Sequence, residues 1–211
     1  MPKQTLDKDE MAIAQKGAMP AEWSPSKRRQ KDVQARWTKK HGKSYFGFKL
    51  SNSVDSRSKL IRRVHVSTAS ENDILHVERV LDANNTSRDI LADKGYVGGE
   101  REQFRRAHGW RVHIQCKGQA GKPLSDCQER RNKRIAKVRA RVANVFAGLE
   151  QMGGKALRSI GLARATLHLN WKAATYNQRR MCSLMEAGPT PFRRPKWARI
   201  ARKRLNPGAE W

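Results

Sequence analysis

Hydrophobic and polar positions along the middle of the chain alternate with two different periods, which predicts strands and helices in turn. Residues 44–50 and 60–67 are rich in β-branched and aromatic side chains and flank a stretch of turn residues, so we expect a β-hairpin. Apolar positions at helical spacing predict a helix over 72–81. Short apolar runs at 90–92 and 110–115 predict two further strands, and a polar helix is expected between them over 99–108.

Two longer helical patterns follow. Residues 127–152 carry an apolar side chain every third or fourth position from Ile135 onward, and the pair Gly153-Gly154 ends the helix. A second helix is expected over 163–180, and its candidate packing residues are Leu167, Leu169, Trp171, Ala174 and Tyr176.

The order hairpin, helix, strand, helix, strand, long helix predicts an α/β fold. In open α/β sheets the chemistry lies at the carboxyl ends of the strands, and Asp93 directly follows the strand expected over 90–92. A carboxylate there suits a metal ligand on a catalytic edge. It equally suits a cap for the turn at Gly95. The spacing alone leaves both roles open.

The outer segments differ in composition from this α/β region. We expect a basic, irregular arm over residues 1–43, one domain over 44–186, and a disordered basic tail over 187–211. At the start of the arm, the residues from Thr5 to Glu10 suit the cap of a short helix through Ala14. Within the arm, Trp23 and Trp37 lie near basic clusters. They suit stacking on nucleic-acid bases, and equally suit anchoring of the arm on the core.

Charge narrows the choice of partner. The chain has 45 Lys and Arg against 19 Asp and Glu, a formal net charge of +26. Such an excess indicates a polyanionic partner, most simply nucleic acid, although a solvated basic surface or a ribosome-associated protein would share it. The candidate DNA contacts are Arg28, Arg29, Lys31, Lys39, Lys40, Arg130, Arg131, Lys133, Arg134, Lys137, Arg139 and Arg141.

Other classes of protein are disfavoured. No apolar run is long enough to cross a membrane, and the first residues do not resemble a signal peptide. The three cysteines have no metal-ligand spacing, so we expect free thiols in a reducing cytoplasm.

Five stretches of the chain follow a pattern known from one family: Lys31–Lys49, Val66–Asp73, Ala92–Tyr96, Asn132–Asn144 and Gln151–Ala165. Together they resemble DDE transposases of insertion sequences, of the family usually called IS-five. The resemblance covers roughly residues 17–186.

The resemblance implies an RNase H-like catalytic domain that cleaves and joins DNA strands. Two aspartates and a glutamate in such enzymes hold two divalent cations, usually Mg²⁺, whose preferred ligands are hard oxygens. Asp93 matches the second aspartate, and is therefore the expected catalytic and metal-binding residue. The implied partners are DNA at transposon ends and a homodimer or a full-length transposase. The implied location is the cytoplasm of a bacterium, at the nucleoid.

The sequence also departs from the family pattern. The first aspartate is expected on a central strand upstream of the hairpin, and we find no candidate for it between Met1 and the hairpin. Ala143 occupies the position of the glutamate, although Arg139 matches the family's arginine one turn earlier. Glu150 lies two helical turns beyond Ala143, about 10.5 Å along the axis, and is expected as a surface carboxylate.

We therefore expect a transposase by descent that lacks the central first strand and is inactive alone. A non-catalytic DNA-binding remnant or regulator of a full-length transposase is the alternative. An RNA-binding or ribosome-associated protein would fit the charge but leaves the stretch from Asp93 to Tyr96 unexplained.

Overall fold

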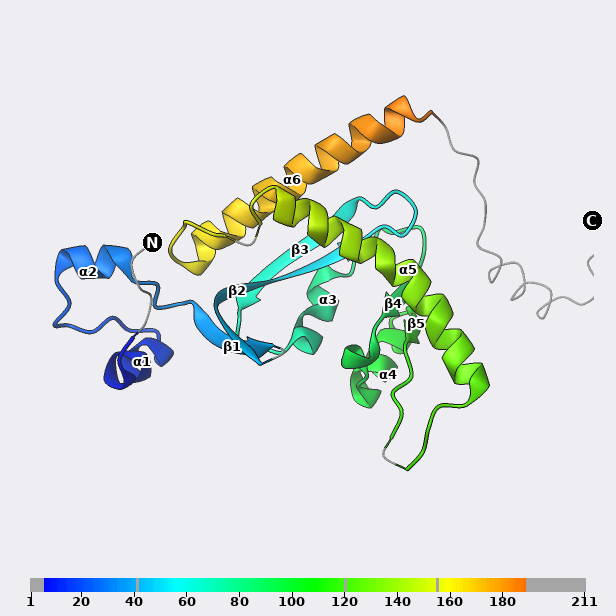
Figure 1. Ribbon diagram of the computed structural model, residues 1–211, viewed down its shortest axis with the longest axis horizontal. Helices are drawn as coiled ribbons and strands as arrows, with labels where there is room; N and C mark the ends of the chain where they lie inside the picture. The colour runs from blue at the N-terminus through cyan, green and yellow to red at the C-terminus, as the bar shows by residue number, and fades with distance from the viewer. Residues whose placement is uncertain (1–5, 41, 120, 155, 189–211) are drawn as a thin grey trace, which may run out of the picture.

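Two small sheets and two long helices dominate this computed structural model, which describes residues 6–40, 42–119, 121–154 and 156–188 (Figure 1). The first sheet is antiparallel with strand order β1-β2-β3, and the second is the parallel pair β4-β5. The strands are β1 (Arg36–Lys40), β2 (Lys43–Val54), β3 (Ile61–Thr68), β4 (Asp89–Ala92) and β5 (Arg111–Ile114). The mixed α/β class expected from the pattern is confirmed.

The predicted hairpin is the centre of the first sheet. Strand β2 pairs with β3 from Phe48 to Val54, while β1 pairs only with the first part of β2, up to Gly47. The turn between β2 and β3 is closed by Asp55, whose carboxylate accepts hydrogen bonds from Ser58. The second half of β2 therefore has one edge that no strand covers within the described residues.

The short helix expected through Ala14 is confirmed as α1 (Lys8–Gln15), whereas helix α2 (Pro25–Gln30) and strand β1 lie in the part of the arm expected to be irregular. The helices are too short to show a sustained period, but both have caps. Asp7 and Glu10 form a capping box on α1, and Ser24 caps α2 ahead of its proline. The proposed boundary between 43 and 44 falls inside the β1-β2 hairpin.

The arm also has its own small core. Trp23 is buried against Ala14 and Val33, and its Nε1 donates a hydrogen bond to Glu10 at 2.8 Å. Trp23 therefore packs within the arm itself, so neither base stacking nor anchoring of the arm on the main core describes its role. Trp37, on β1, is more exposed and packs against Phe46 with ring centroids 5.2 Å apart.

The helices after β3 follow the expected order with shifted bounds. The helix predicted over 72–81 is the 3-10 turn η1 (Asp73–His76) followed by α3 (Val77–Val80). A second 3-10 turn, η2 (Lys94–Tyr96), and helix α4 (Gly99–Ala107) connect β4 to β5. The long helices are α5 (Asp126–Gln151) and α6 (Leu162–Glu186), and α6 continues beyond its expected end at 180.

The main core lies where α5 and α6 cross the hairpin (Figure 1). Ile61, Val145, Leu149 and Ala173 are buried together, with Tyr176 packed against them. A Cβ added at Gly148 would lie 2.9 Å from the Tyr176 ring, so the helices approach closely here. The apolar stripe predicted on α5 thus does face the core.

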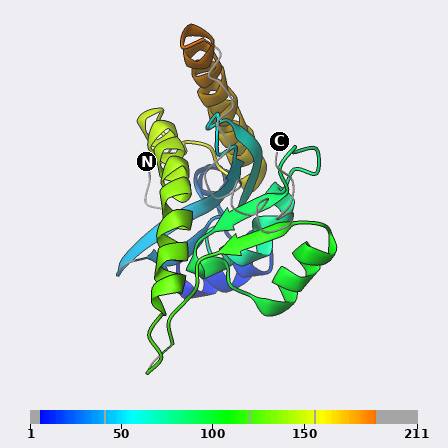
Figure 2. The same cartoon turned by 90° about the vertical axis from the view of Figure 1, so that its right-hand side faces the viewer.

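The packing face predicted for α6 is partly wrong. Leu169 is buried and Tyr176 packs on the core, but Leu167, Trp171 and Ala174 are exposed. The buried residues Ala165, Leu169 and Ala173 repeat at a spacing of four and set the side that faces the sheet. The C-terminal part of α6 extends beyond the sheets in both views (Figures 1 and 2). Of the predicted tail, residues 189–211 lie outside the described residues.

Candidate active site and nucleic-acid interface

Asp93 occupies the carboxyl end of β4, as the pattern predicted. Strand β4 stops at Ala92, and the Asp93 side chain caps η2 by accepting a hydrogen bond from the Gly95 backbone N–H at 2.9 Å. A Cβ at position 95 would lie 3.0 Å from the Asp93 carboxylate, so glycine leaves that carboxylate room. Asp93 therefore does act as a turn cap, the second of the two roles that its spacing left open.

The second carboxylate oxygen of Asp93 faces helix α5. Arg139 forms an ion pair with it, with Nη2 3.0 Å from Oδ2. Both side chains are about one third exposed, 30% for Arg139 and 37% for Asp93, so water screens the pair and its net stabilisation is small. One oxygen thus accepts from the turn and the other pairs with an arginine.

A groove with a volume of about 3040 Å³ runs past this carboxylate. Its lining comes from β1, β2, β4 and α5, and so from both sheets. The lining includes apolar side chains: Phe48 and Leu50 of β2, Ile90 of β4, and Val138, Val142 and Phe146 of α5. Asp93 and Arg139 line the same groove.

The predicted DNA contacts divide into two groups. Lys and Arg outnumber Asp and Glu among the groove-lining side chains, and six predicted residues belong to this lining: Lys39, Lys40, Arg134, Lys137, Arg139 and Arg141. The other six, which lie elsewhere, are Arg28, Arg29, Lys31, Arg130, Arg131 and Lys133. Arg131 serves the fold instead, because its guanidinium donates to the Ile114 carbonyl at 2.7 Å.

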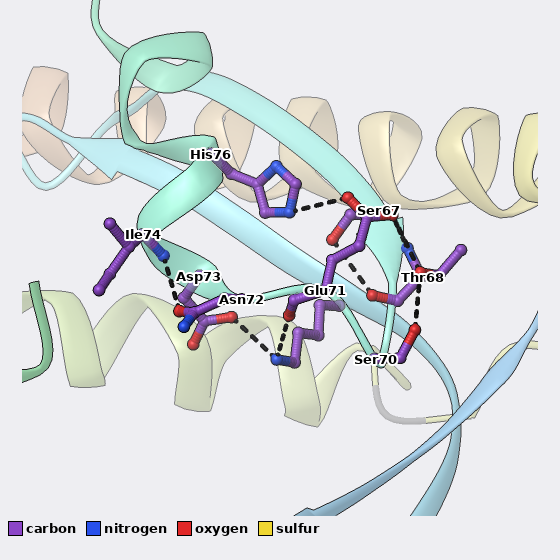
Figure 3. Close-up of polar contacts among 9 residues, drawn as sticks. Ser67, Thr68, Ser70, Glu71, Asn72, Asp73, Ile74 and His76 are labelled. Carbon is purple, nitrogen blue, oxygen red and sulfur yellow. Dashed lines mark hydrogen bonds and ion pairs between the residues drawn. The ribbon is translucent and has the colours of Figure 1, made fainter. Parts of the chain in front are cut away.

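A polar turn after β3 forms the neighbouring part of the site (Figure 3). Glu71 accepts a hydrogen bond from the Thr68 hydroxyl at 2.9 Å, and Asn72 caps η1 through the Ile74 N–H at 3.2 Å. Lys49 of β2 donates to the Glu71 carbonyl at 2.6 Å and pairs with Asp73 at 3.2 Å. These contacts fix the turn that carries Asp73 into the groove.

The histidine pair behind this turn is structural. His76 is buried, lies 3.2 Å from the Glu71 carboxylate, and packs against the His65 ring at 4.7 Å between centroids. Burial lowers the pKa of His65, and the charges of His76 and Arg79 lower it further. Burial alone would raise the pKa of Glu71, but hydrogen bonds from Thr68 and the nearby histidines outweigh it and lower that pKa.

Tyr96, on η2, lines the groove within the electrostatic influence of two acidic side chains. Burial raises the pKa of its phenol, and the negative charges of Asp73 and Asp93 raise it further. Sequence reasoning missed Lys49, Glu71, Asp73 and Tyr96 as neighbours of the site. The stretches that carried the family resemblance contain all four, but their contacts join β2, η1 and η2, and no local spacing encodes those contacts.

A different carboxylate occupies the start of β4. Asp89 bonds Arg111 at 2.7 Å and His113 at 3.0 Å, both on the paired strand β5. Burial alone would raise the pKa of Asp89. The hydrogen bonds from Arg111, His113 and Ser87 outweigh it and hold that pKa at about 2.

The residues present do not fit a pair of divalent cations. No group of three His, Cys, Asp or Glu side chains within the described parts of the chain is placed to hold a metal ion. Ala143 is exposed on α5, four residues beyond Arg139, and supplies no ligand. Glu150 lines the groove near the end of α5, two turns further along. Asp93 thus shares the groove with Asp73, but within the described residues no group of three ligands forms around it.

The fold and the groove define a strongly cationic α/β domain with a carboxylate at a strand end. Residues 16–178 match the family described as the transposase DDE domain, and the chain belongs to this family. Membership implies an RNase H-like fold and a divalent metal cofactor. The finer assignment to IS-five stays a prediction.

A curated relative agrees with this membership. The transposase for insertion sequence element IS1106 of Neisseria meningitidis serogroup B is 26% identical over 166 residues, which are 78% of this chain and 56% of the relative. The chain thus spans little more than half the length of that relative.

No solved structure matches. No helix among the described residues is both long and apolar enough to span a membrane.

Proposed function

We propose that this chain derives from an insertion-sequence transposase of the IS-five type, and that on its own it binds DNA without cleaving it. The observation that carries the proposal is the setting of Asp93. Asp93, which matches the family's second aspartate, stands at the end of β4. Its Oδ1 caps the turn and its Oδ2 is paired with Arg139, and Ala143 occupies the position of the third acid. A divalent pair needs several carboxylates around it.

The cationic side chains of the groove support DNA as the partner. Arg134, Lys137 and Arg141 lie on α5, and Lys39 and Lys40 lie on β1, so both sides of the groove carry positive charge. Phosphate contacts of this kind give affinity that falls steeply with salt and depends little on sequence. Transposon ends are the DNA that the family would recognise, and the cytoplasm at the nucleoid is the corresponding location.

The apolar part of the groove lining suits contact with a polypeptide strand better than contact with phosphate. Strands β2 and β4 both border it, and Phe48, Ile90 and Val142 line it. In an RNase H-like sheet, a central strand with the first aspartate lies between two such strands. We propose that this strand completes the site in an active enzyme, and that it comes from outside the described residues or from a partner such as a full-length transposase.

Nicking of supercoiled plasmid tests the proposal. The purified chain and its Asp93→Asn variant are compared with Mg²⁺ and with Mn²⁺, and gel shifts at low salt report DNA binding by the same samples. We expect both proteins to shift DNA and neither to nick it. Nicking that requires the metal and is lost in Asp93→Asn would contradict the proposal, because it would require a complete site.

Failure to shift DNA at low salt would contradict the binding half of the proposal. The Lys40→Ala, Lys137→Ala double variant tests whether the groove is the DNA-binding surface, because both side chains line it. The Arg29→Ala, Lys133→Ala variant removes the same number of charges from exposed positions outside it. We expect only the first variant to weaken binding strongly.

A further inference from the structure

Helix α6 carries a row of exposed residues that the main core does not use. The row is Leu167, Trp171, Ala174, Gln178, Met181 and Met185, with spacings that alternate between four and three. Its large members are strongly exposed, 60% for Leu167, 67% for Trp171, 52% for Met181 and 78% for Met185. Alternating spacings of this kind align side chains along one side of a helix, as in a coiled-coil seam. We call this row the α6 seam.

The seam lies on the side of α6 opposite the body of the protein. The body side is fixed by buried Ala165, Leu169 and Ala173, and by polar contacts to the hairpin. Asn177 exchanges hydrogen bonds with the backbone of Ile61, and Arg180 donates to the Ser58 carbonyl at 2.8 Å. At 100° per residue, the middle of the seam lies about half a turn from buried Ala165, Leu169 and Ala173, whereas Asn177 lies about a quarter turn from it, at the border between the two sides. The exposed row is thus the outer side of a helix whose inner side is already used.

Charge distinguishes this side from the rest of the surface. Charged residues make up 30% of the chain. Neither the seam nor its flanking positions between 167 and 185 include one: the flanking residues are His168, Asn170, Thr175, Cys182 and Leu184. The border residue Asn177, which bonds to Ile61, is uncharged as well. A DNA-binding side would need cations here, and an acidic partner helix would need basic flanks to select it. A neutral seam with neutral flanks is compatible with a copy of itself.

We propose that the α6 seam binds the α6 seam of a second copy of this chain in an antiparallel pair. Antiparallel pairing about a two-fold axis near residue 176 places Leu167 against Met185 of the second copy, and Trp171 against Met181. Met packs well against an aromatic ring. The smaller residues Ala174 and Gln178 meet near the axis, where the helices approach closely.

The ends of α6 favour this orientation over a parallel one. Antiparallel pairing sets Arg164 near Glu186 of the second copy, whereas a parallel pair sets like charges together. It also places the half of α6 that extends beyond the sheets (Figures 1 and 2) over the body-bound half of the other helix. The two bodies, in a chain of net charge +26, then lie at opposite ends of the pair.

Sedimentation analysis of the full chain tests the proposal, at a salt concentration that suppresses non-specific association. We expect a dimer, and Trp171→Glu should raise its dissociation constant at least about 30-fold, because a two-fold interface loses this anchor twice. Ser183→Glu introduces the same charge on the body side of the exposed helix end and should leave the dimer intact. A monomer at high micromolar concentration, or a dimer indifferent to Trp171→Glu, would overturn the proposal.

Disulfide trapping tests the orientation. Cys182 and His168 are flanking positions that an antiparallel pair brings side by side, whereas within one helix they are 14 residues, about 21 Å, apart. In a Cys127→Ser background, which removes the other exposed thiol, His168→Cys should form a disulfide with Cys182 of the second copy under mild oxidation. A dimer that Trp171→Glu disrupts but that gives no such cross-link would overturn the antiparallel arrangement. Circular dichroism of each variant checks that the fold is kept.

Discussion

Asp89 begins the short strand β4 and Asp93 directly follows its end, and the two carboxylates have different surroundings and different roles. The Asp89 side chain is 13% exposed and bonds two cationic or polar residues of β5, which ties the parallel pair together. The Asp93 side chain is 37% exposed, borders the groove, and has one arginine partner from a different element. A carboxylate near a strand end is therefore not by itself a functional group, and the neighbours that tertiary structure brings decide its role.

The largest expected effect comes from removing the charge at the structural end. Asp89→Asn should lower the free energy of unfolding by about 2 kcal/mol, because it leaves Arg111 and His113 without their charged acceptor. Urea unfolding followed by circular dichroism measures this change. A loss as small as that of a surface substitution would show that Asp89 is not structural.

Acid should remove the same contribution. The pKa of Asp89 is lowered from its ordinary value of 3.8 to about 2, so its stabilisation is present above pH 4 and is lost as the pH falls towards 2. The difference in unfolding free energy between the wild type and Asp89→Asn should shrink over that interval. Urea midpoints measured from neutral to acid pH test it. A difference that stays constant down to pH 2 would contradict the assigned cause.

DNA affinity should depend on where a cation lies on α5. Lys137 lines the groove and Lys133 does not, although they are one turn apart. Lys137→Ala should weaken DNA binding several-fold and reduce the slope of log affinity against log salt by about 1. Lys133→Ala is the matched control, and equal effects would mean that the groove is not the DNA surface. Fluorescence anisotropy over a salt series provides both quantities.

The smallest expected effect belongs to Asp93, at the carboxyl end of β4. Asp93→Asn should change the free energy of unfolding by at most about 1 kcal/mol, because its ion pair with Arg139 is partly exposed. DNA affinity should be retained or slightly increased, since a negative charge leaves the groove. A destabilisation as large as that of Asp89→Asn would erase the contrast between the two ends.

Local patterns predicted an element well where the periodic pattern continued over many residues. The hairpin, the apolar stripe of α5 and the position of Asp93 after β4 all followed from spacing or strand order. The arm was mispredicted after α1, because α2 spans only 6 residues and is held by its N-terminal cap. The packing residues of α6 were mispredicted because two sides of that helix are apolar. Spacing shows both sides, but only the tertiary structure shows which one meets the sheet.

The candidate site shows the same limit. Asp93 and Arg139 were found through the family resemblance, and the lack of a glutamate at Ala143 could be read directly. The role of Arg139 as the partner of Asp93 could not, because 46 residues of chain separate them. Lys49, Asp73 and Tyr96 come together from β2, η1 and η2, so their meeting at the groove depends on the whole fold.

Titration of Mg²⁺ and Mn²⁺ into the isolated chain, followed by calorimetry, tests the central claim most directly. The claim is that Asp93 is paired with Arg139 and does not hold a divalent pair. We expect no saturable binding in the micromolar range and the same weak response from Asp93→Asn. Low-micromolar binding that Asp93→Asn abolishes would contradict the account, because it would require further ligands around Asp93.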